Sequence, residues 1–385
     1  MLTDRASGHM VDATEPLSPG VVIGLHSGLP GLRYGFGIRV STWLLTALVF
    51  GGQVMAVRAA DLLVTRWEGR TMGSPYTVQI VGAALDTEQV EQLQLKMEQE
   101  LQEVNRQMSH YQADSELSRF NRAPAKAPFK VSADFARVMR FTLELCRRSA
   151  GALDPTLAPV INLWGFGEKT TSRSVPTAAA LEAARKHTGW RGLTVTADDE
   201  LVKDSAELTI NLSAVAKGFG VDQMARLLQQ QGLTNSYVSI AGEVRVLGHN
   251  SRGTNWQVGI SAPISSWRED GPMAAVASLS GQAISTSGDY QKFFFDVEGR
   301  RLCHVFDPKT GWPVQHNLGG VSVVAPESMT ADALSTILFV LGPTEGMKFI
   351  DSWTNAAALF IVREAEDRFR AIPSSRFAQL TDYRP

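Results

Sequence analysis

Cysteine is scarce in this sequence, and that scarcity excludes several kinds of site. The chain of 385 residues contains two cysteines, Cys146 and Cys303, and no CxxC pair. Two thiolates cannot complete a four-cysteine zinc site. Cys146 falls on the apolar face of an expected helix, so we expect it to pack in the core. We expect the same of Cys303, which lies in a strand-like stretch, with a redox or disulfide role as the alternative.

An excess of charge of either sign is also missing. The chain has 37 basic and 39 acidic residues, which give a net charge of −2. This balance provides no electrostatic footprint for nucleic acid, although it is compatible with a small local anion site. The hydrophobic content of 44% and the charged content of 20% are typical of a soluble globular protein. The length allows two domains or one large one.

Long apolar runs are absent apart from one near the N-terminus. Arg39 is followed by 18 residues without charge, Val40 to Val57. A basic flank, an apolar stretch and small residues before Asp61 describe a secretory signal peptide. An uncleaved membrane anchor is the alternative, because 18 uncharged residues reach the lower limit for a membrane span.

We therefore divide the chain into an N-terminal leader, residues 1–60, and one domain, residues 61–385. Cleavage is expected after Ala59 or Ala60, where small residues recur at the spacing that signal peptidase requires. No cysteine lies near this site, which argues against a bacterial lipoprotein. We expect an exported protein.

The apolar periodicity of the domain predicts strands in runs as well as between helices. Residues 86–108 carry an apolar stripe at helical spacing, with Asp86 and Gln89 placed for a capping box. Ser132 and Thr330 are the expected caps of two further helices. This pattern favours an α+β fold, with mixed or antiparallel sheets covered by helices on one side. Other helices are expected at 177–188 and 216–231, strands within 62–82, 236–263, 274–303, 319–325 and 357–364, and loops at 109–128 and 149–176.

A lysine opens one of the expected helices. In NLSAVAKGFG, 211–220, a short strand leads into a turn, and Ala216-Lys217-Gly218 begins the helix. The free N–H groups and partial positive charge of a helix N-terminus suit a phosphate, and Lys217 adds a full charge. The spacing of a P-loop is absent. From these residues alone, an anion site and a solvated surface lysine are both open.

A carboxylate and a hydroxyl interrupt the apolar helix expected near the C-terminus. Asp332 and Thr336 in MTADALSTILFVLG are four apart, so on a helix they share one face. One interpretation places Asp332 in the first turn, where it interacts with the helix dipole. The other lets the pair present two hard oxygens to one cation.

Three more stretches carry groups that a binding site would use. GALDPTLAPVINLWGFG, 151–167, contains Asp154 and two aromatic residues that either line a pocket or anchor a loop. ISTSGDYQKFFF, 284–295, is rich in hydroxyls. HVFDPKTGWP, 304–313, begins with His304, which is either structural or a site residue.

Taken in order along the chain, these stretches resemble the ApbE family, the FAD:protein FMN transferases. The resemblance covers about residues 61–380 and implies an ApbE-like, T-fold-related α+β architecture. It implies Mg²⁺-dependent transfer of the FMN part of FAD onto a Thr or Ser hydroxyl of a target flavoprotein, with release of AMP. The motifs that carry it are MGSPYTV, SHYQADSELSRFN, GALDPTLAPVINLWGFG, NLSAVAKGFGVDQ, SIAGEVRVLG, STSGDYQKFF, HVFDPKTGWPV and ADALSTILFVLG.

The resemblance also implies roles for single residues. Mg²⁺ would be held by the Ala214 carbonyl, Asp332 and Thr336. His304 is our candidate for a base near the acceptor hydroxyl, with Asp307 as a weaker one. The residues expected to contact FAD are Met72, Tyr111, Ala152, Leu153, Asp154, Asn211, Lys217 and Phe306.

Three positions depart from the family pattern. Asn211 stands where many members have aspartate, so the local charge differs. Ala241 stands where a second glycine is common, which tightens that turn. Ser335 replaces a second carboxylate before Thr336, so the number of metal ligands is reduced.

Two other functions fit the same residues. A Mg²⁺-dependent FAD pyrophosphatase would produce FMN and AMP with water as the nucleophile, and a non-catalytic FAD-binding protein would need no acceptor. Family acceptors are subunits of membrane redox complexes, such as sodium-pumping quinone reductases, Rnf-type complexes and nitrous-oxide reductase maturation factors. The resemblance therefore implies a periplasmic protein, or one on the inner membrane facing the periplasm.

Overall fold

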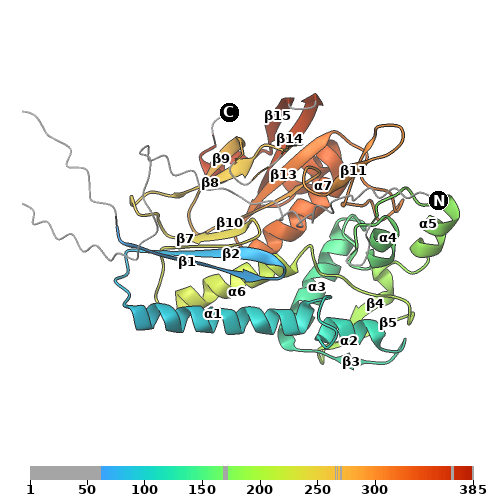
Figure 1. Cartoon of the computed structure of the whole chain (residues 1–385), viewed down its shortest axis with the longest axis horizontal. Helices are drawn as coiled ribbons and strands as arrows, with labels where there is room; N and C mark the ends of the chain where they lie inside the picture. The colour runs from blue at the N-terminus through green and yellow to red at the C-terminus, as the bar shows by residue number, and fades with distance from the viewer. Residues whose placement is uncertain are drawn as a thin grey trace, which may run out of the picture.

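One eight-stranded antiparallel sheet organises the chain, with strand order β1-β2-β6-β7-β10-β13-β14-β15 (Figure 1). The computed structural model describes residues 62–167, 172–264, 266, 268, 271–365 and 368–383. The expected leader and its cleavage site lie outside these residues, so they stay predictions. The strands are β1 Val64–Thr71, β2 Ser74–Val81, β6 Ser236–Ile240, β7 Glu243–Leu247, β10 Ala283–Gly288, β13 Leu318–Ala325, β14 Ala357–Ala365 and β15 Arg368–Pro373.

Three helices cover one face of this sheet, α1 Thr87–Met108, α6 Ala216–Gln230 and α7 Ser328–Asp351. The other face packs against the hairpin of β8 (Trp256–Ser261) and β9 (Met273–Leu279), and against α8 (Phe377–Thr381). The expected α+β fold with helices on one side is therefore confirmed. The hairpin over the second face was not foreseen.

The remaining elements lie at one end of the sheet and beside α7 (Figure 1). A three-stranded sheet has the order β3-β5-β4, and β11 pairs with β12. These elements are α2 Glu116–Arg122, β3 Phe129–Lys130, α3 Ala133–Arg148, α4 Ala158–Leu163, α5 Ala178–Arg185, η1 Trp190–Gly192, β4 Leu193–Val195, β5 Glu200–Lys203, β11 Phe293–Phe295 and β12 Arg301–Cys303.

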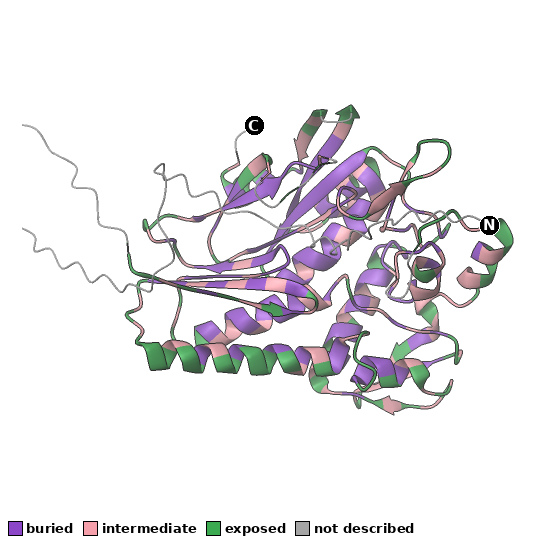
Figure 2. Cartoon of the chain, in the orientation of Figure 1, coloured by how far each residue is buried: buried purple, intermediate pink, exposed green. Residues whose placement is uncertain are grey.

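Local sequence signals account for α1. The predicted capping box is present, because Asp86 accepts from the Gln89 N–H and the Gln89 side chain accepts from the Asp86 N–H. Leu93, Met97 and Leu101 are buried as the periodicity predicts, while the outer face of the helix is exposed (Figure 2). Cys146 and Cys303 are free and buried in the apolar core, as expected.

Four local predictions are wrong. The expected loop at 149–176 contains the short helix α4, and the short strand expected before the turn into α6 is irregular backbone. The expected loop at 109–128 contains α2, whose first turn is capped by Ser115 through the Ser118 N–H at 2.9 Å. Thr330 does not cap α7, which begins at Ser328 without a capping side chain of its own, so Asp332 lies beyond the first turn. The sequence analysis also overlooked the short strands β3 to β5, β15 and α8, whose spans are too brief for a clear periodic signal.

The N-termini of α6 and α7 cap each other. Asp222 on α6 accepts hydrogen bonds from the backbone N–H groups of Ser328 and Met329, both at 2.9 Å, and pairs with Arg245 at 2.5 Å. In return, Asp332 Oδ2 on α7 accepts from the Gly218 N–H at 3.0 Å. Each carboxylate thus satisfies orphan donors at the start of the other helix.

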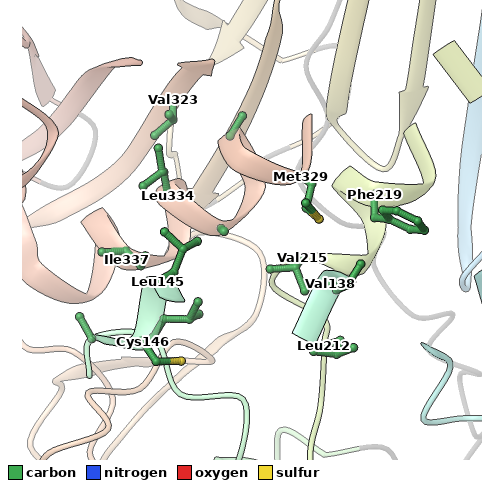
Figure 3. Close-up of a cluster of buried hydrophobic side chains, with 14 of the residues drawn as sticks. Val138, Leu145, Cys146, Leu212, Val215, Phe219, Val323, Met329, Leu334 and Ile337 are labelled. Atoms are coloured by element: carbon green, nitrogen blue, oxygen red, sulfur yellow. The ribbon is translucent and has the colours of Figure 1, made fainter. Parts of the chain in front are cut away.

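Gly218 makes this close crossing possible. A Cβ at this position would lie 2.4 Å from the Ser328 carbonyl oxygen, which no side chain tolerates. Apolar side chains pack around the crossing, among them Val215, Phe219, Met329 and Leu334 (Figure 3). The polar exchange is therefore sealed from water by the largest core cluster.

Helix α7 is the central core helix. Among the described residues it alone is long and apolar enough to cross a membrane, yet it packs between β10, β13 and α6. It bends at Gly342, where φ is 74°, before Pro343. Since Pro343 has no N–H, the Phe339 carbonyl lacks its helical partner and instead interacts with His316 Nε2 at 2.6 Å.

The β6–β7 turn generates a stability prediction. Ala241 and Gly242 have φ values of 56° and 117°, and an alanine is strained in the left-handed region. We expect Ala241→Gly to raise the free energy of unfolding by about 0.5–1 kcal/mol, because relief of strain exceeds the added chain entropy. Urea denaturation measures it.

The matched control is Ala179→Gly on the exposed surface of α5. There the same chemical change should lower stability by about 0.5–1 kcal/mol. A loss of stability at both positions would contradict the strain at Ala241.

Candidate active site

Three charged side chains meet at the start of α6. Lys217 is the second residue of α6, and its Nζ forms an ion pair with Glu243 Oε1 at the start of β7. Asp332 reaches the same helix N-terminus from α7 through its bond to Gly218. The Lys217 side chain is 21% exposed and that of Glu243 only 5%. Lys217 is therefore not a solvated surface lysine: its ammonium pairs with the buried Glu243, and the buried Asp332 acts on it electrostatically.

Burial and charge act in opposition on these groups. Burial raises the pKa of Asp332 to about 7, against the lowering effect of the Lys217 ammonium. Burial alone would lower the pKa of Lys217, but Glu243 and Asp332 together raise it. The cluster thus holds a positive charge beside a carboxylate whose pKa burial raises.

The predicted metal ligands lie around this cluster. The Gly218 N–H is one of the unpaired donors in the first turn of α6, and it donates to Asp332 and not to the Ala214 carbonyl four residues earlier. Within the described ranges, no hydrogen bond reaches the Ala214 carbonyl oxygen or Asp332 Oδ1. The Thr336 hydroxyl lies one turn later and donates to the Asp332 carbonyl at 3.4 Å.

These donors fit a hard divalent cation. A free carbonyl, a carboxylate oxygen and a hydroxyl are the ligands that Mg²⁺ prefers. The described residues contain no group of three or more His, Cys, Asp or Glu side chains that could hold a metal ion. A metal here would therefore depend on the carbonyl and the hydroxyl, as the replacement of a family carboxylate by Ser335 implies. Ser335 itself bonds to Ser287 at 2.8 Å.

A backbone hydrogen bond links the segments that contain Asp154 and Asn211. The Asn211 N–H donates to the Pro155 carbonyl at 2.7 Å, which fixes the 154–156 turn beside the segment that leads into α6. Asp154 accepts from the Thr156 N–H at 2.8 Å and from the Trp190 N–H at 3.2 Å. Burial raises the pKa of Asp154 despite these bonds.

A cavity of ≈ 380 Å³ opens beside Asp154. Gly151 and Trp190 form part of its wall, and Pro308 and Lys309 close it from the loop that follows His304. Residues from two of the predicted motifs, 151–167 and 304–313, thus line the same cavity. Ala152 and Leu153, also predicted to line the flavin pocket, are buried in the core cluster that contains Val215.

His304 lies beside an aromatic cluster. Phe166 contacts Phe306 and His304, with ring centroids 5.9 and 6.5 Å apart, and Trp164 packs on Phe306. The His304 Nδ1 lies 3.3 Å from the Lys292 carbonyl oxygen. Burial, with help from Lys292 and Lys217, lowers the pKa of His304 to about 4. The imidazole is therefore neutral at physiological pH, the state in which a base acts.

Three other predicted residues are placed differently. The carboxylate of Asp307 accepts from the Lys309 N–H at 2.9 Å and from the Thr310 hydroxyl at 3.3 Å, so it shapes a turn. Met72 packs close to Gly220 on α6. Tyr111 is 67% exposed after the end of α1 and stacks on His110.

Glu243 and Asp222 are the residues that sequence reasoning missed. Glu243 follows the Ala241-Gly242 turn in SIAGEV, and the two charged residues on one face of the short strand EVRVL were the available signal. Asp222 lies within α6 and reads as an ordinary helix surface residue. Its role depends on a helix more than one hundred residues later in the chain.

Comparisons with known proteins agree with this architecture. The model of the ApbE family matches residues 72–360. A protein named FAD:protein FMN transferase from Haemophilus influenzae is 38% identical over 345 residues, 88% of this chain and 98% of its own. The protein of that name from Escherichia coli is 34% identical over 317 residues, 82% of this chain and 88% of its own.

Solved structures match over a similar extent. The flavin transferase ApbE from Vibrio cholerae superposes with a TM-score of 0.74 at 37% identity, covering 83% of this chain and 99% of that one. The apo form of Pseudomonas stutzeri flavinyl transferase ApbE gives a TM-score of 0.74 at 34% identity, with 84% and 98% covered. By family model, relatives and structure, the chain belongs to the ApbE family.

Proposed function

We propose that this chain is an FAD:protein FMN transferase, as the names of its relatives state for those proteins. It moves the FMN moiety of FAD onto a Thr or Ser hydroxyl of an acceptor flavoprotein and releases AMP. The observation that carries the proposal is the buried cluster of Lys217, Glu243 and Asp332 beside an unbonded carbonyl at a helix N-terminus. Such a site suits a pyrophosphate and its counter-ion.

The reaction exchanges one phosphorus–oxygen bond for another. The acceptor hydroxyl oxygen attacks the FMN phosphorus of the FAD pyrophosphate, and the bond from that phosphorus to the AMP oxygen breaks. The hydroxyl proton passes to a base, and AMP leaves with the bonding electron pair. The product is a phosphodiester between FMN and the acceptor. Catalysis of this kind consists mostly of positioning and charge stabilisation.

The residues around α6 supply both. Lys217 and the N-terminus of α6 would hold the pyrophosphate. The Ala214 carbonyl, Asp332 and Thr336 would hold Mg²⁺, which when bound neutralises the pyrophosphate and the departing AMP. Asp154, Asn211 and the adjoining cavity would take the remainder of FAD.

The neutral His304 is the proposed base. With its Nδ1 directed at the Lys292 carbonyl, its Nε2 is the nitrogen left to accept the proton of the acceptor hydroxyl. Asp307 is the weaker candidate, because its carboxylate already accepts two hydrogen bonds within its own turn.

The acceptor and the compartment follow from the leader and the family resemblance. Arg39 and the uncharged run Val40 to Val57 favour export, so we propose action in the periplasm or on the inner membrane facing it. Acceptors would be flavoprotein subunits of membrane redox complexes in that compartment.

One assay tests the proposal. Purified protein is incubated with FAD, Mg²⁺ and a candidate acceptor, and the acceptor is analysed by mass spectrometry. We expect a mass gain equal to FMN on the acceptor and an equal amount of AMP. AMP without acceptor modification would identify an FAD pyrophosphatase, and neither product would identify an FAD-binding protein.

Asp332 makes Mg²⁺ binding depend on pH. Because its pKa in the metal-free protein is about 7, Mg²⁺ must displace a proton at lower pH. We expect the apparent Mg²⁺ affinity to be about tenfold weaker at pH 6 than at pH 8. Mg²⁺ titrations of the transfer rate at both pH values measure it. Asp332→Ala should abolish the Mg²⁺ dependence, and full Mg²⁺-dependent activity in this variant would remove Asp332 from the metal site.

Removal of the base should affect the chemical step alone. We expect His304→Ala to reduce the transfer rate by about 10²–10⁴-fold, the usual contribution of a general base, with FAD binding preserved. Single-turnover transfer and flavin fluorescence measure the two quantities. Asp307→Asn is the control, and the rate should change little because the amide oxygen still accepts from the Lys309 N–H of the turn. Wild-type turnover in His304→Ala would exclude it as the base.

A further inference from the structure

Two carboxylates lie beside one ammonium, and only one of them binds it. Lys217 Nζ forms its ion pair with Glu243. Asp332, whose charge also acts on Lys217, bonds instead to the Gly218 N–H through Oδ2 at 3.0 Å. The ammonium is therefore drawn toward β7 rather than toward α7.

This choice matters for a cation site. An ammonium hydrogen-bonded to Asp332 would compete with a divalent cation for the same lone pairs and would repel it. Both effects are strong where water is excluded, and Asp332 is only 4% exposed. A site that needs Lys217 for the pyrophosphate and Asp332 for the metal must keep the two side chains apart.

Glu243 is fixed where it can do this. It is the first residue of β7 and pairs with Ile240 across the Ala241-Gly242 turn. It is buried, and its Oε2 has no hydrogen-bond partner in the part of the chain that the structure describes. Among the described residues, Lys217 is thus the side chain that compensates this buried carboxylate.

We propose that Glu243 is a positioning residue that holds the Lys217 ammonium away from Asp332 and so keeps Asp332 Oδ1 available for a divalent cation. The inference rests on the proposed function only in taking Asp332 as a metal ligand. It gives the Glu243–Lys217 ion pair a role in metal binding, beyond any role in substrate binding or folding.

The test is a double-mutant cycle with Mn²⁺ as the probe. Mn²⁺ binding to the purified full chain without FAD is measured by electron paramagnetic resonance for wild type, Glu243→Gln, Lys217→Met and the double variant. We expect Glu243→Gln to weaken Mn²⁺ binding on the order of tenfold, a typical coupling between neighbouring charges, because Lys217 turns to Asp332. Lys217→Met in that background should restore the affinity, since the competing ammonium is gone.

The control separates this role from general stability. Glu116→Gln makes the same change at a buried glutamate on α2, which pairs at 2.9 Å with the half-exposed Arg106. It should lower the thermal midpoint and leave Mn²⁺ affinity unchanged. Glu243→Asp, which keeps the charge, should recover part of the affinity lost in Glu243→Gln.

Several outcomes would overturn the inference. If the double variant binds Mn²⁺ as weakly as Glu243→Gln, Glu243 ligates the metal directly instead of positioning Lys217. If Glu243→Gln binds Mn²⁺ like wild type, the pair is structural. Wild type that transfers FMN but binds no Mn²⁺ without FAD would sink the inference and leave the proposed function intact. If the variants show the expected Mn²⁺ affinities but the wild type transfers no FMN, the inference stands and the proposed function is wrong.

Discussion

The exchange of carboxylates between α6 and α7 is the interaction on which the rest of this structure depends. Asp222 binds the first N–H groups of α7, and Asp332 binds a first-turn N–H of α6. Helix N-termini carry unsatisfied donors and partial positive charge, so two of them in contact would repel without these anions. The exchange turns an unfavourable contact into a fixed crossing, and Gly218 allows the backbones to approach.

The same exchange creates the site. Asp332 binds the Gly218 N–H through Oδ2, and among the described residues no hydrogen bond reaches its Oδ1 or the Ala214 carbonyl just before α6, so both oxygens remain available to the proposed cation. Burial that raises the pKa of Asp332 costs free energy in the ionised state, and a cation bound as proposed would recover it. In that case the ligand would complete the fold, as happens where polar groups are kept for function.

The sequence predicted interactions between residues that are close along the chain, and it missed those between residues that are far apart. The capping box of α1 and the spacing of Asp332 and Thr336 are local, so periodicity and capping rules found them. Thr330 failed as a cap because Asp222 caps α7 from another helix. Glu243 was invisible for the same reason, since its ion pair with Lys217 joins a helix to a strand and no spacing encodes it. The roles of the site residues came from family resemblance and not from spacing.

The register of strand β7 determines how the geometry of the proposed site would be lost on unfolding. Glu243 and Arg245 are two residues apart, so both point to the helical side of the sheet, one to Lys217 and the other to Asp222. A slip of β7 by one residue would turn both side chains to the opposite face at once. The ion pair of the proposed site and the ion pair at the helix crossing therefore depend on the same register of β7. The site should open only when the central sheet opens, and its geometry inherits the cooperativity of the whole domain.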